Sequence, residues 1–228
     1  MALVLHYHPL SSCCWKVLIA LYEAGTPFEP RLLQFGDEDA TAAFRALWPT
    51  AKIPLLEDDG RIVPETSIII EHLDRHHPGA APLLPRDADA RLEARLWDRL
   101  FDLYAMTPMQ RAVAQHLRPE AERDPRGLDE ARRDLAMIYD LIETRLAGRI
   151  WAAGDEFGIA DCAAAPALFY AAAVLPYPDG HDVLAAYVDR LLARPSVART
   201  IAEAAPFMAY FPLRDALPPR FRLMTEAR

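Results

Sequence analysis

Short apolar runs and one amphipathic stretch occupy the first third of the chain. Residues 3–7 form an apolar run typical of a strand, and residues 12–24 place apolar side chains at helical spacing before Gly25. Residues 28–33 are predicted to form a second strand, parallel to the first because a helix of this length makes the crossover. The pattern therefore predicts a βαβ unit.

Two more apolar runs, 53–57 and 61–63, are separated by Asp58, Asp59 and Gly60. The Asp-Gly pair supplies the positive φ angles that a tight hairpin needs. A helix is predicted over 66–75, and the order βαβ followed by ββα predicts a small mixed sheet covered by helices.

Helical spacing dominates the remainder of the chain. The proline-rich segment 80–89 has no periodicity and is interpreted as a linker between domains at 1–79 and 90–228. Two sets of apolar residues recur at helical spacing, and each set predicts the buried face of a long helix. They are Leu92, Leu96, Leu100 and Tyr104, and Leu135, Ile138, Ile142 and Leu146. Residues 162–178 are predicted to include a buried helix, and the prolines after residue 205 predict an irregular tail.

Composition and charge exclude several classes of function. The 228 residues are 52% hydrophobic and 25% charged, which is typical of a folded protein with a real core. The net charge of -8 argues against general affinity for nucleic acid or anionic lipid. Three cysteines suggest no disulfide framework, and no His/Cys spacing resembles a zinc site. The first residues lack the apolar core of a signal peptide, so a cytoplasmic location is expected.

The turn between the first strand and the first helix carries Ser11, Ser12, Cys13 and Cys14. Unpaired N–H groups and the dipole at a helix N-terminus stabilise an anion such as a thiolate. Lowering a thiol pKa by two units needs about 2.7 kcal/mol, and a hydrogen bond to a charged group contributes about 1.5 to 3 kcal/mol. In the alternative interpretation, a serine only caps the helix and the cysteines pack as small apolar residues.

Two later segments supply groups that suit an amino-acid ligand. Lys52, Ile53 and Pro54 precede a strand, where the proline can hold a cis peptide and expose the backbone of Ile53 to an extended peptide. Glu65 and Thr66 open the next helix, so Thr66 and its neighbouring N–H groups can take a carboxylate while Glu65 takes an ammonium.

These motifs together resemble the glutathione site of the glutathione transferase superfamily. The segments are SSCCWKVLIAL, KIPLL and ETSIIIEHL, and AGDEFGIADCAAAPAL resembles the start of the central helix in that superfamily's helical domain. The resemblance covers nearly the whole chain. It implies an α/β thioredoxin-like N-terminal domain followed by an all-α C-terminal domain. It also implies glutathione as co-substrate, a homodimer, a role in detoxification, and no nucleic acid or membrane partner.

The resemblance also assigns residues to parts of glutathione. Ile53 is expected to pair its backbone with the cysteinyl part, with Pro54 as the cis-proline. Glu65 and Thr66 are expected to hold the γ-glutamyl end, and Lys52 stands near the position of the glycyl carboxylate.

Three routes to thiol activation follow from the same resemblance. The SSCxW stretch is most similar to the zeta class, where the first serine, Ser11 here, hydrogen bonds the glutathione sulfur. Tyr7, at the end of the first strand, is the second candidate, and a route through Cys13 or Cys14 remains open. Asp161 matches a helix-capping residue of the family and is expected to serve folding rather than catalysis.

The leading hypothesis is a glutathione transferase that presents the thiolate to a small hydrophobic electrophile. The electrophile is expected to contact Leu10, Tyr104, Met106, Met109 and His116. In the alternative interpretation, each of these residues is part of the core. A glutathione-dependent cis–trans isomerase of the maleylacetoacetate type is an alternative, although residues 169–174 lack the arginine that would anchor a carboxylate. A non-catalytic glutathione- or ligand-binding module is the third hypothesis.

Overall fold

The N-terminal part of the chain is a mixed β-sheet covered by helices. We describe a computed structural model, in which residues 3–34, 36 and 38–226 are described. The elements of this part are β1 (Leu3–Tyr7), α1 (Ser12–Ala24), β2 (Glu29–Leu32), α2 (Glu38–Leu47), β3 (Leu55–Asp58), β4 (Arg61–Pro64) and α3 (Thr66–His76). Among the described residues the sheet has four strands in the order β2-β1-β3-β4, with β1 parallel to β2 and antiparallel to β3. The predicted mixed sheet is confirmed.

The local signals in this part and the observed elements agree closely. Asp59 and Gly60 have φ angles of 48° and 84°, as the hairpin prediction requires. Helix α2 was not predicted, although Ala40, Ala43, Phe44 and Leu47 stand at helical spacing; only Phe44 among its residues is buried.

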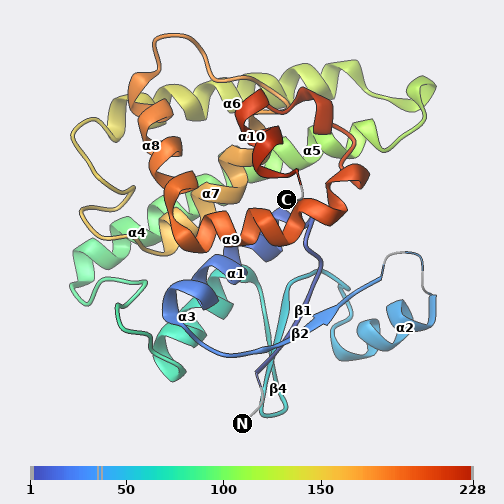
Figure 1. The fold of residues 1–228 in the computed structure, drawn as a ribbon, viewed down its shortest axis with the longest axis vertical. Coiled ribbons are helices and arrows are strands. Elements are labelled where there is room, and N and C mark those ends of the chain that lie inside the picture. Colours follow the sequence, from blue (N-terminus) through green and yellow to red (C-terminus); the bar gives the residue numbers. More distant parts are fainter. Residues whose placement is uncertain (1–2, 35, 37, 227–228) are drawn as a thin grey trace.

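The remainder of the chain is helical (Figure 1). Its longer elements are α4 (Ala88–Leu100), the π-helix η1 (Phe101–Met106), α5 (Thr107–His116), α6 (Pro125–Arg145), α7 (Ile159–Ala171), α8 (Asp182–Ala193), α9 (Pro195–Ala204) and α10 (Pro219–Met224). Every residue of α7 is buried, which confirms the predicted buried helix. Helix α1 packs against α7 and α9, so it belongs to the contact between sheet and helical parts (Figure 1).

The two predicted apolar faces have different outcomes. Leu135, Ile138, Ile142 and Leu146 are all buried, as expected. The prediction for the first long helix is wrong, since Leu92 is 67% exposed, Leu96 49% and Tyr104 44%. The inner face of that helix is instead formed by Ala94, Trp97 and Phe101. The large aromatic rings of Trp97 and Phe101 pack into the core.

The C-terminal segment is more ordered than predicted. It forms the 3-10 helices η3 (Ala205–Tyr210) and η4 (Arg214–Ala216) before α10, so the expectation of an irregular tail is wrong. Phe221 of α10 is fully buried and stacks on Phe169 of α7 with ring centroids 5.2 Å apart. This aromatic contact fixes the end of the chain on the helical core.

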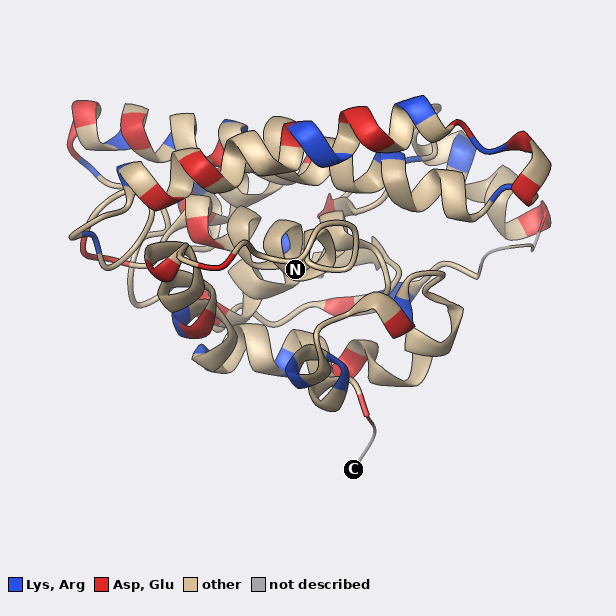
Figure 2. Cartoon of the chain, turned by 90° about the horizontal axis from the view of Figure 1, so that it is seen from above, with Lys and Arg blue, Asp and Glu red and all other residues tan. Residues whose placement is uncertain are grey.

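The described surface carries both signs of charge. In Figure 2, basic and acidic segments are interspersed along the outer helices. A helix with the length and hydropathy of a membrane span is not found among the described residues.

Candidate functional site

Three segments that are distant in sequence meet at one end of the sheet. His6 of β1 lies opposite Leu55 of β3, and Leu55 lies opposite Pro64 of β4. The turn after β1, the segment before β3 and the start of α3 therefore leave the sheet at the same edge. The structure thus brings the Ser11, Ile53-Pro54 and Glu65-Thr66 segments to one region, as the sequence motifs require.

Ser11 caps the N-terminus of α1. Its Oγ accepts a hydrogen bond from the Cys14 N–H at 3.3 Å, and its own N–H donates to the His8 carbonyl at 3.0 Å. The first turn of α1 contains no acidic residue. The helix dipole and the Ser11 hydroxyl therefore favour a bound anion, although the capping bond occupies one lone pair of that hydroxyl.

The segment before β3 offers backbone rather than side chains. The peptide bond between Ile53 and Pro54 is cis, as the motif predicts. Pro54 is buried, Ile53 is half-buried, and Lys52 is exposed. The Lys52 side chain can therefore reach a ligand only from the solvent side.

The start of α3 has an unusual backbone. Glu65 has φ 68° and ψ 124°, in a region that non-glycine residues seldom occupy and that is often found at functional sites. No side chain of the described residues caps this helix N-terminus. Its first N–H groups, including that of Thr66, are available to a ligand carboxylate.

An apolar hollow of about 230 Å³ adjoins Ser11. Its lining residues are Leu10, Ser11, Ser12, Met109, Gln110, Val113, Ala114, Leu117, Tyr170 and Phe211. Leu10 and Met109 were expected to line the electrophile site, and they do line this hollow. The other three expected residues do not line it: Met106 is buried in the core, Tyr104 is exposed and lines another hollow, and His116 is absent from the lining.

Tyr7 belongs to a different hollow, of about 400 Å³, which it lines with Tyr22, Arg199 and Glu203. Among the described residues, this lining shares no member with the hollow beside Ser11. Burial, followed by the negative charge of Glu203, raises the pKa of Tyr7. The hydroxyl is therefore held in its neutral form, in surroundings separate from the Ser11 hollow.

Neither cysteine of the α1 turn is placed to act as a thiolate. Cys14 is fully buried, and this burial raises its pKa from 9.0 to about 12. Burial also raises the pKa of Cys13, whose Sγ accepts a hydrogen bond from Gln110 Nε2 at 3.3 Å. This geometry opposes a cysteine route.

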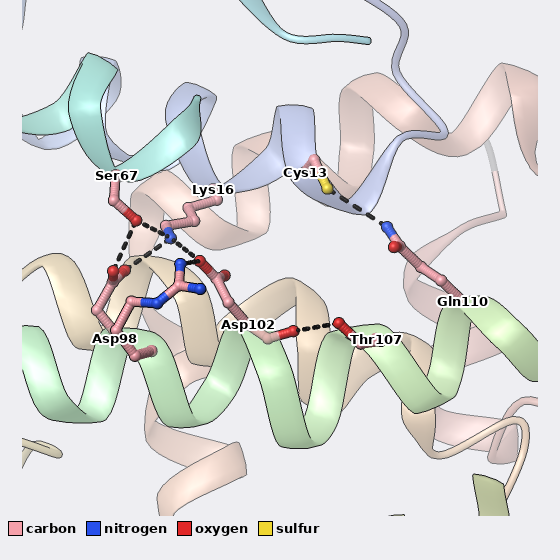
Figure 3. A network of polar contacts seen from close by, with 8 residues as sticks. Cys13, Lys16, Ser67, Asp98, Asp102, Thr107 and Gln110 are labelled. Atoms are coloured by element: carbon pink, nitrogen blue, oxygen red, sulfur yellow. Dashed lines mark hydrogen bonds and ion pairs between the residues drawn. The ribbon is translucent and has the colours of Figure 1, made fainter. Parts of the chain in front are cut away.

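Lys16 is the centre of a buried ionic network that the sequence analysis missed (Figure 3). Its ammonium group is fully buried and lies 2.6 Å from Asp98 Oδ1 and 2.8 Å from Asp102 Oδ2. The ammonium also donates to Ser67 Oγ at 2.9 Å, and this hydroxyl in turn donates to Asp98 at 2.6 Å. The network joins α1 and α3 to the long helix formed by α4 and η1.

The charge pattern around Lys16 gives a signal that could have revealed this network. Lys16 lies within an otherwise apolar stretch of its helix, between Trp15 and Val17, and Asp98 follows Trp97. A charge within a buried pattern requires a partner. Burial raises the pKa of Asp98, and the Lys16 charge opposes that effect. Sequence alone could not say which carboxylate pairs with which cation.

Asp161 stabilises the start of α7, as expected. Its carboxylate accepts hydrogen bonds from Gly158 N–H at 2.9 Å, Ala152 N–H at 3.0 Å and Tyr187 Oη at 2.6 Å. A Cβ at Gly158 would approach the Leu83 carbonyl oxygen to 2.8 Å, which explains why a serine or threonine is absent from the cap. Asp161 is fully buried and serves folding.

Comparison with known proteins identifies the family. Residues 5–81 match the glutathione S-transferase N-terminal domain, and residues 100–195 match its C-terminal domain. The chain is 31% identical to the glutathione S-transferase GstB of Escherichia coli over 161 residues, 68% of this chain and 76% of that protein. It is 37% identical to a probable maleylacetoacetate isomerase of Caenorhabditis elegans over 92 residues, 40% of this chain and 42% of that protein.

Solved structures agree with this result. A glutathione S-transferase of Methylobacterium radiotolerans in complex with glutathione sulfonate is 33% identical, with a TM-score of 0.76 over 88% of this chain and 94% of its own. A glutathione S-transferase of Methylobacillus flagellatus with glutathione bound is 25% identical, with a TM-score of 0.78 over 87% of this chain and 98% of its own. Sequence, fold and the converging motifs agree, and the chain belongs to the glutathione S-transferase family.

Proposed function

We propose that this protein is a glutathione transferase in which Ser11 stabilises the glutathione thiolate for attack on a small hydrophobic electrophile. The observation that carries the proposal is the position of Ser11. Its hydroxyl lies at the N-terminus of α1 and also lines the hollow of about 230 Å³ whose other walls come largely from the helical part. A thiolate placed here would meet an apolar substrate directly.

The remaining motif residues would bind the rest of glutathione. The backbone of Ile53 would hydrogen bond the cysteinyl backbone of glutathione, and Pro54 would keep the Ile53 backbone accessible. Thr66 and the open N-terminus of α3 would take the γ-glutamyl carboxylate, and Glu65 would take the γ-glutamyl ammonium. Lys52, which is exposed, would approach the glycyl carboxylate.

The lining of the hollow supports an apolar electrophile. Leu10, Met109 and Phe211 offer apolar surface, and the described residues that line the hollow include no lysine or arginine. A dicarboxylate substrate would need such a cation. The similarity to a probable maleylacetoacetate isomerase keeps isomerisation as a second candidate, which the missing cation disfavours. A binding module without turnover is the third candidate.

We also propose a homodimer. Leu92, Leu96, Leu103 and Tyr104 form an exposed apolar stripe on α4 and η1, next to an apolar hollow lined by Met137 and Leu141 of α6. Exposed apolar surface of this kind is typical of a protein interface. The N-terminal domain of one subunit would face the helical domain of the other. The domain boundaries at 79 and 90, the cytoplasmic location and the role in detoxification are parts of the same proposal.

Calorimetric titration with glutathione, together with a thioether-formation assay using 1-chloro-2,4-dinitrobenzene, tests the proposal. Wild type is expected to bind glutathione and form the thioether. Thr66→Val should weaken glutathione binding, whereas Thr144→Val, on the far helix α6, should not. Binding without turnover of any electrophile would favour the binding module, and absence of glutathione binding would overturn the proposal.

A further inference from the structure

A cluster of two histidines and one aspartate lies at the end of the sheet away from the Ser11 turn. Asp58 is the last residue of β3 and pairs with Leu3 and Arg61, whereas the other end of β3 pairs with His6. His72 is in the last turns of α3, and His77 follows that helix. The cluster is therefore separate from the proposed glutathione site.

The donor atoms of the cluster converge. Asp58 Oδ2 is 2.7 Å from His72 Nε2 and 2.9 Å from His77 Nε2. One oxygen of the Asp58 carboxylate and one nitrogen of each imidazole lie within 4.8 Å of one another. The side chains are 13%, 7% and 21% exposed for Asp58, His72 and His77, so the cluster is mostly enclosed but has one accessible side.

The arrangement differs from the other histidine–carboxylate contacts of the chain. His6 pairs with Glu57 and His181 with Asp140, one imidazole to one carboxylate. Among residues 3–34, 36 and 38–226, only the Asp58 cluster brings together three such ligand groups. Here two imidazoles contact one carboxylate oxygen, Asp58 Oδ2.

We propose that Asp58, His72 and His77 bind a divalent transition-metal ion, and that zinc suits this donor set best. Two imidazole nitrogens and one carboxylate oxygen are a donor set that zinc accepts, with water in a fourth position. Zinc–ligand bonds of about 2.0 to 2.2 Å in a tetrahedron separate the ligand atoms by about 3.3 Å. The two oxygen–nitrogen distances would therefore have to increase by about half an ångström. Each imidazole would bind in its neutral form, with the ring proton on Nδ1 and the lone pair of Nε2 directed at the ion.

The ion would join two elements that are far apart in sequence. Asp58 ends β3 of the hairpin, and His72 and His77 belong to the C-terminal end of α3. Binding would tie the hairpin to this helix in the folded state only, so the ion would stabilise the N-terminal part. The spacing of 14 residues from Asp58 to His72 resembles no familiar zinc motif, which explains why the sequence suggested no metal site.

Zinc titration of the metal-stripped protein tests the proposal. The protein should be purified without a histidine tag and titrated without glutathione, because extra imidazoles and the glutathione thiol both bind zinc. Calorimetry should show one zinc ion per chain, and thermal unfolding should shift upward. At zinc a hundredfold above Kd, the unfolding equilibrium should shift about a hundredfold.

Two variants test whether zinc binds at the cluster or at a histidine elsewhere in the chain. His77→Gln should lower zinc affinity at least tenfold, so at the same zinc concentration the shift of its unfolding equilibrium should fall to about tenfold or less. His181→Gln is the matched control, since it removes an imidazole that contacts one carboxylate oxygen at 2.8 Å outside any group of three. Cobalt(II) bound to the wild-type protein provides a measurement that needs no variant, because four-coordinate cobalt absorbs visible light much more strongly than the aqua ion.

Several results would overturn the proposal. They are the absence of zinc binding in wild type, equal zinc affinity in wild type and His77→Gln, or loss of binding in His181→Gln alone. If His77→Gln fails to fold, the wild-type protein still provides a test. A cobalt(II) spectrum that remains that of the aqua ion when the protein is added would contradict the proposal equally well. None of these results depends on glutathione binding, so they test the metal site independently of the proposed transferase.

Discussion

The two polar sites on helix α1 are built in opposite ways. At its N-terminus, Ser11 makes one long capping bond and adjoins an apolar hollow. Five residues later, Lys16 is fully buried and contacts Ser67, Asp98 and Asp102 at distances between 2.6 and 2.9 Å. The first site retains hydrogen-bonding capacity for a ligand, whereas the second is saturated by the protein itself.

The difference shows how one helix can serve both chemistry and assembly. A saturated, buried charge cluster fixes α1 relative to α3 and α4. That fixed position allows the open end of the same helix to present a hydroxyl and N–H groups without rearrangement. Changes at Lys16 should therefore alter stability first, and changes at Ser11 should alter chemistry first.

The largest effect is expected for Lys16→Met. Removal of the ammonium leaves Asp98 and Asp102 close together without their shared cation, and breaking a buried ion pair costs about 3 to 5 kcal/mol. Urea unfolding should show this loss. Arg126→Met removes an exposed pair with Glu130 and should cost less than about 1 kcal/mol. Equal stability of the two variants would contradict the assigned role of the Lys16 network.

Ser11→Gly should mainly affect turnover. Glycine keeps helix capping to within a few tenths of a kcal/mol, but it removes a hydrogen bond worth about 1.5 to 3 kcal/mol to a charged sulfur. At a pH below the thiol pKa, kcat/KM should fall about ten- to a hundredfold while urea unfolding changes little. A variant with full activity would remove Ser11 from the mechanism.

Gln110→Leu tests whether the hollow receives the electrophile. Gln110 Nε2 donates to Ser12 Oγ at 3.2 Å and to Cys13 Sγ at 3.3 Å on the wall of the hollow. Added apolar contact of about 0.8 kcal/mol should lower KM for an apolar electrophile about fourfold. Gln115→Leu, on the same helix but outside the lining, should leave this KM unchanged. The same change in both variants would place the electrophile elsewhere.

The smallest effect is expected at the other end of α1, where Glu23 contacts Arg194 and Ser196. Burial pushes the pKa of Glu23 upward, but hydrogen bonds from Arg194 and Ser196 outweigh it and hold the pKa below 4.5. A depressed carboxyl pKa gives stability that is present above the unfolded value and lost as the pH falls below it. As the pH falls from neutral to 4, Glu23→Gln should therefore lose less unfolding free energy than wild type. The difference between the two losses, measured by thermal unfolding, should be no more than about 1 kcal/mol. Parallel pH profiles would contradict this role.

Local signals predicted the sheet part well, because a hairpin with Asp59-Gly60 and a helix ending at Gly25 depend on a few neighbouring residues. The stripe from Leu92 to Tyr104 was assigned to the wrong side, because periodicity shows that a face is apolar but not what covers it. Helix α2 was missed although its apolar residues stand at helical spacing, because two of the four, Ala40 and Ala43, are alanines and give a weak hydrophobic signal.

The candidate site was predictable only in part. Motifs indicated Ser11, Ile53-Pro54 and Glu65-Thr66, since each depends on local backbone geometry. The hollow beside Ser11 could not be predicted, because Tyr170 and Phe211 reach it from distant segments. The partners of Lys16 also come from α3 and the long helix that follows, so only the tertiary structure could identify them.

The pKa of the bound glutathione thiol is the most direct test of the central claim that Ser11 stabilises the thiolate. Ultraviolet absorbance of the thiolate should be followed against pH in wild type, Ser11→Gly and Tyr7→Phe. The wild-type pKa should lie well below about 8.5 and rise by about 1 to 2 units in Ser11→Gly only. A rise in Tyr7→Phe with no change in Ser11→Gly would contradict the account and move the chemistry to the end of β1.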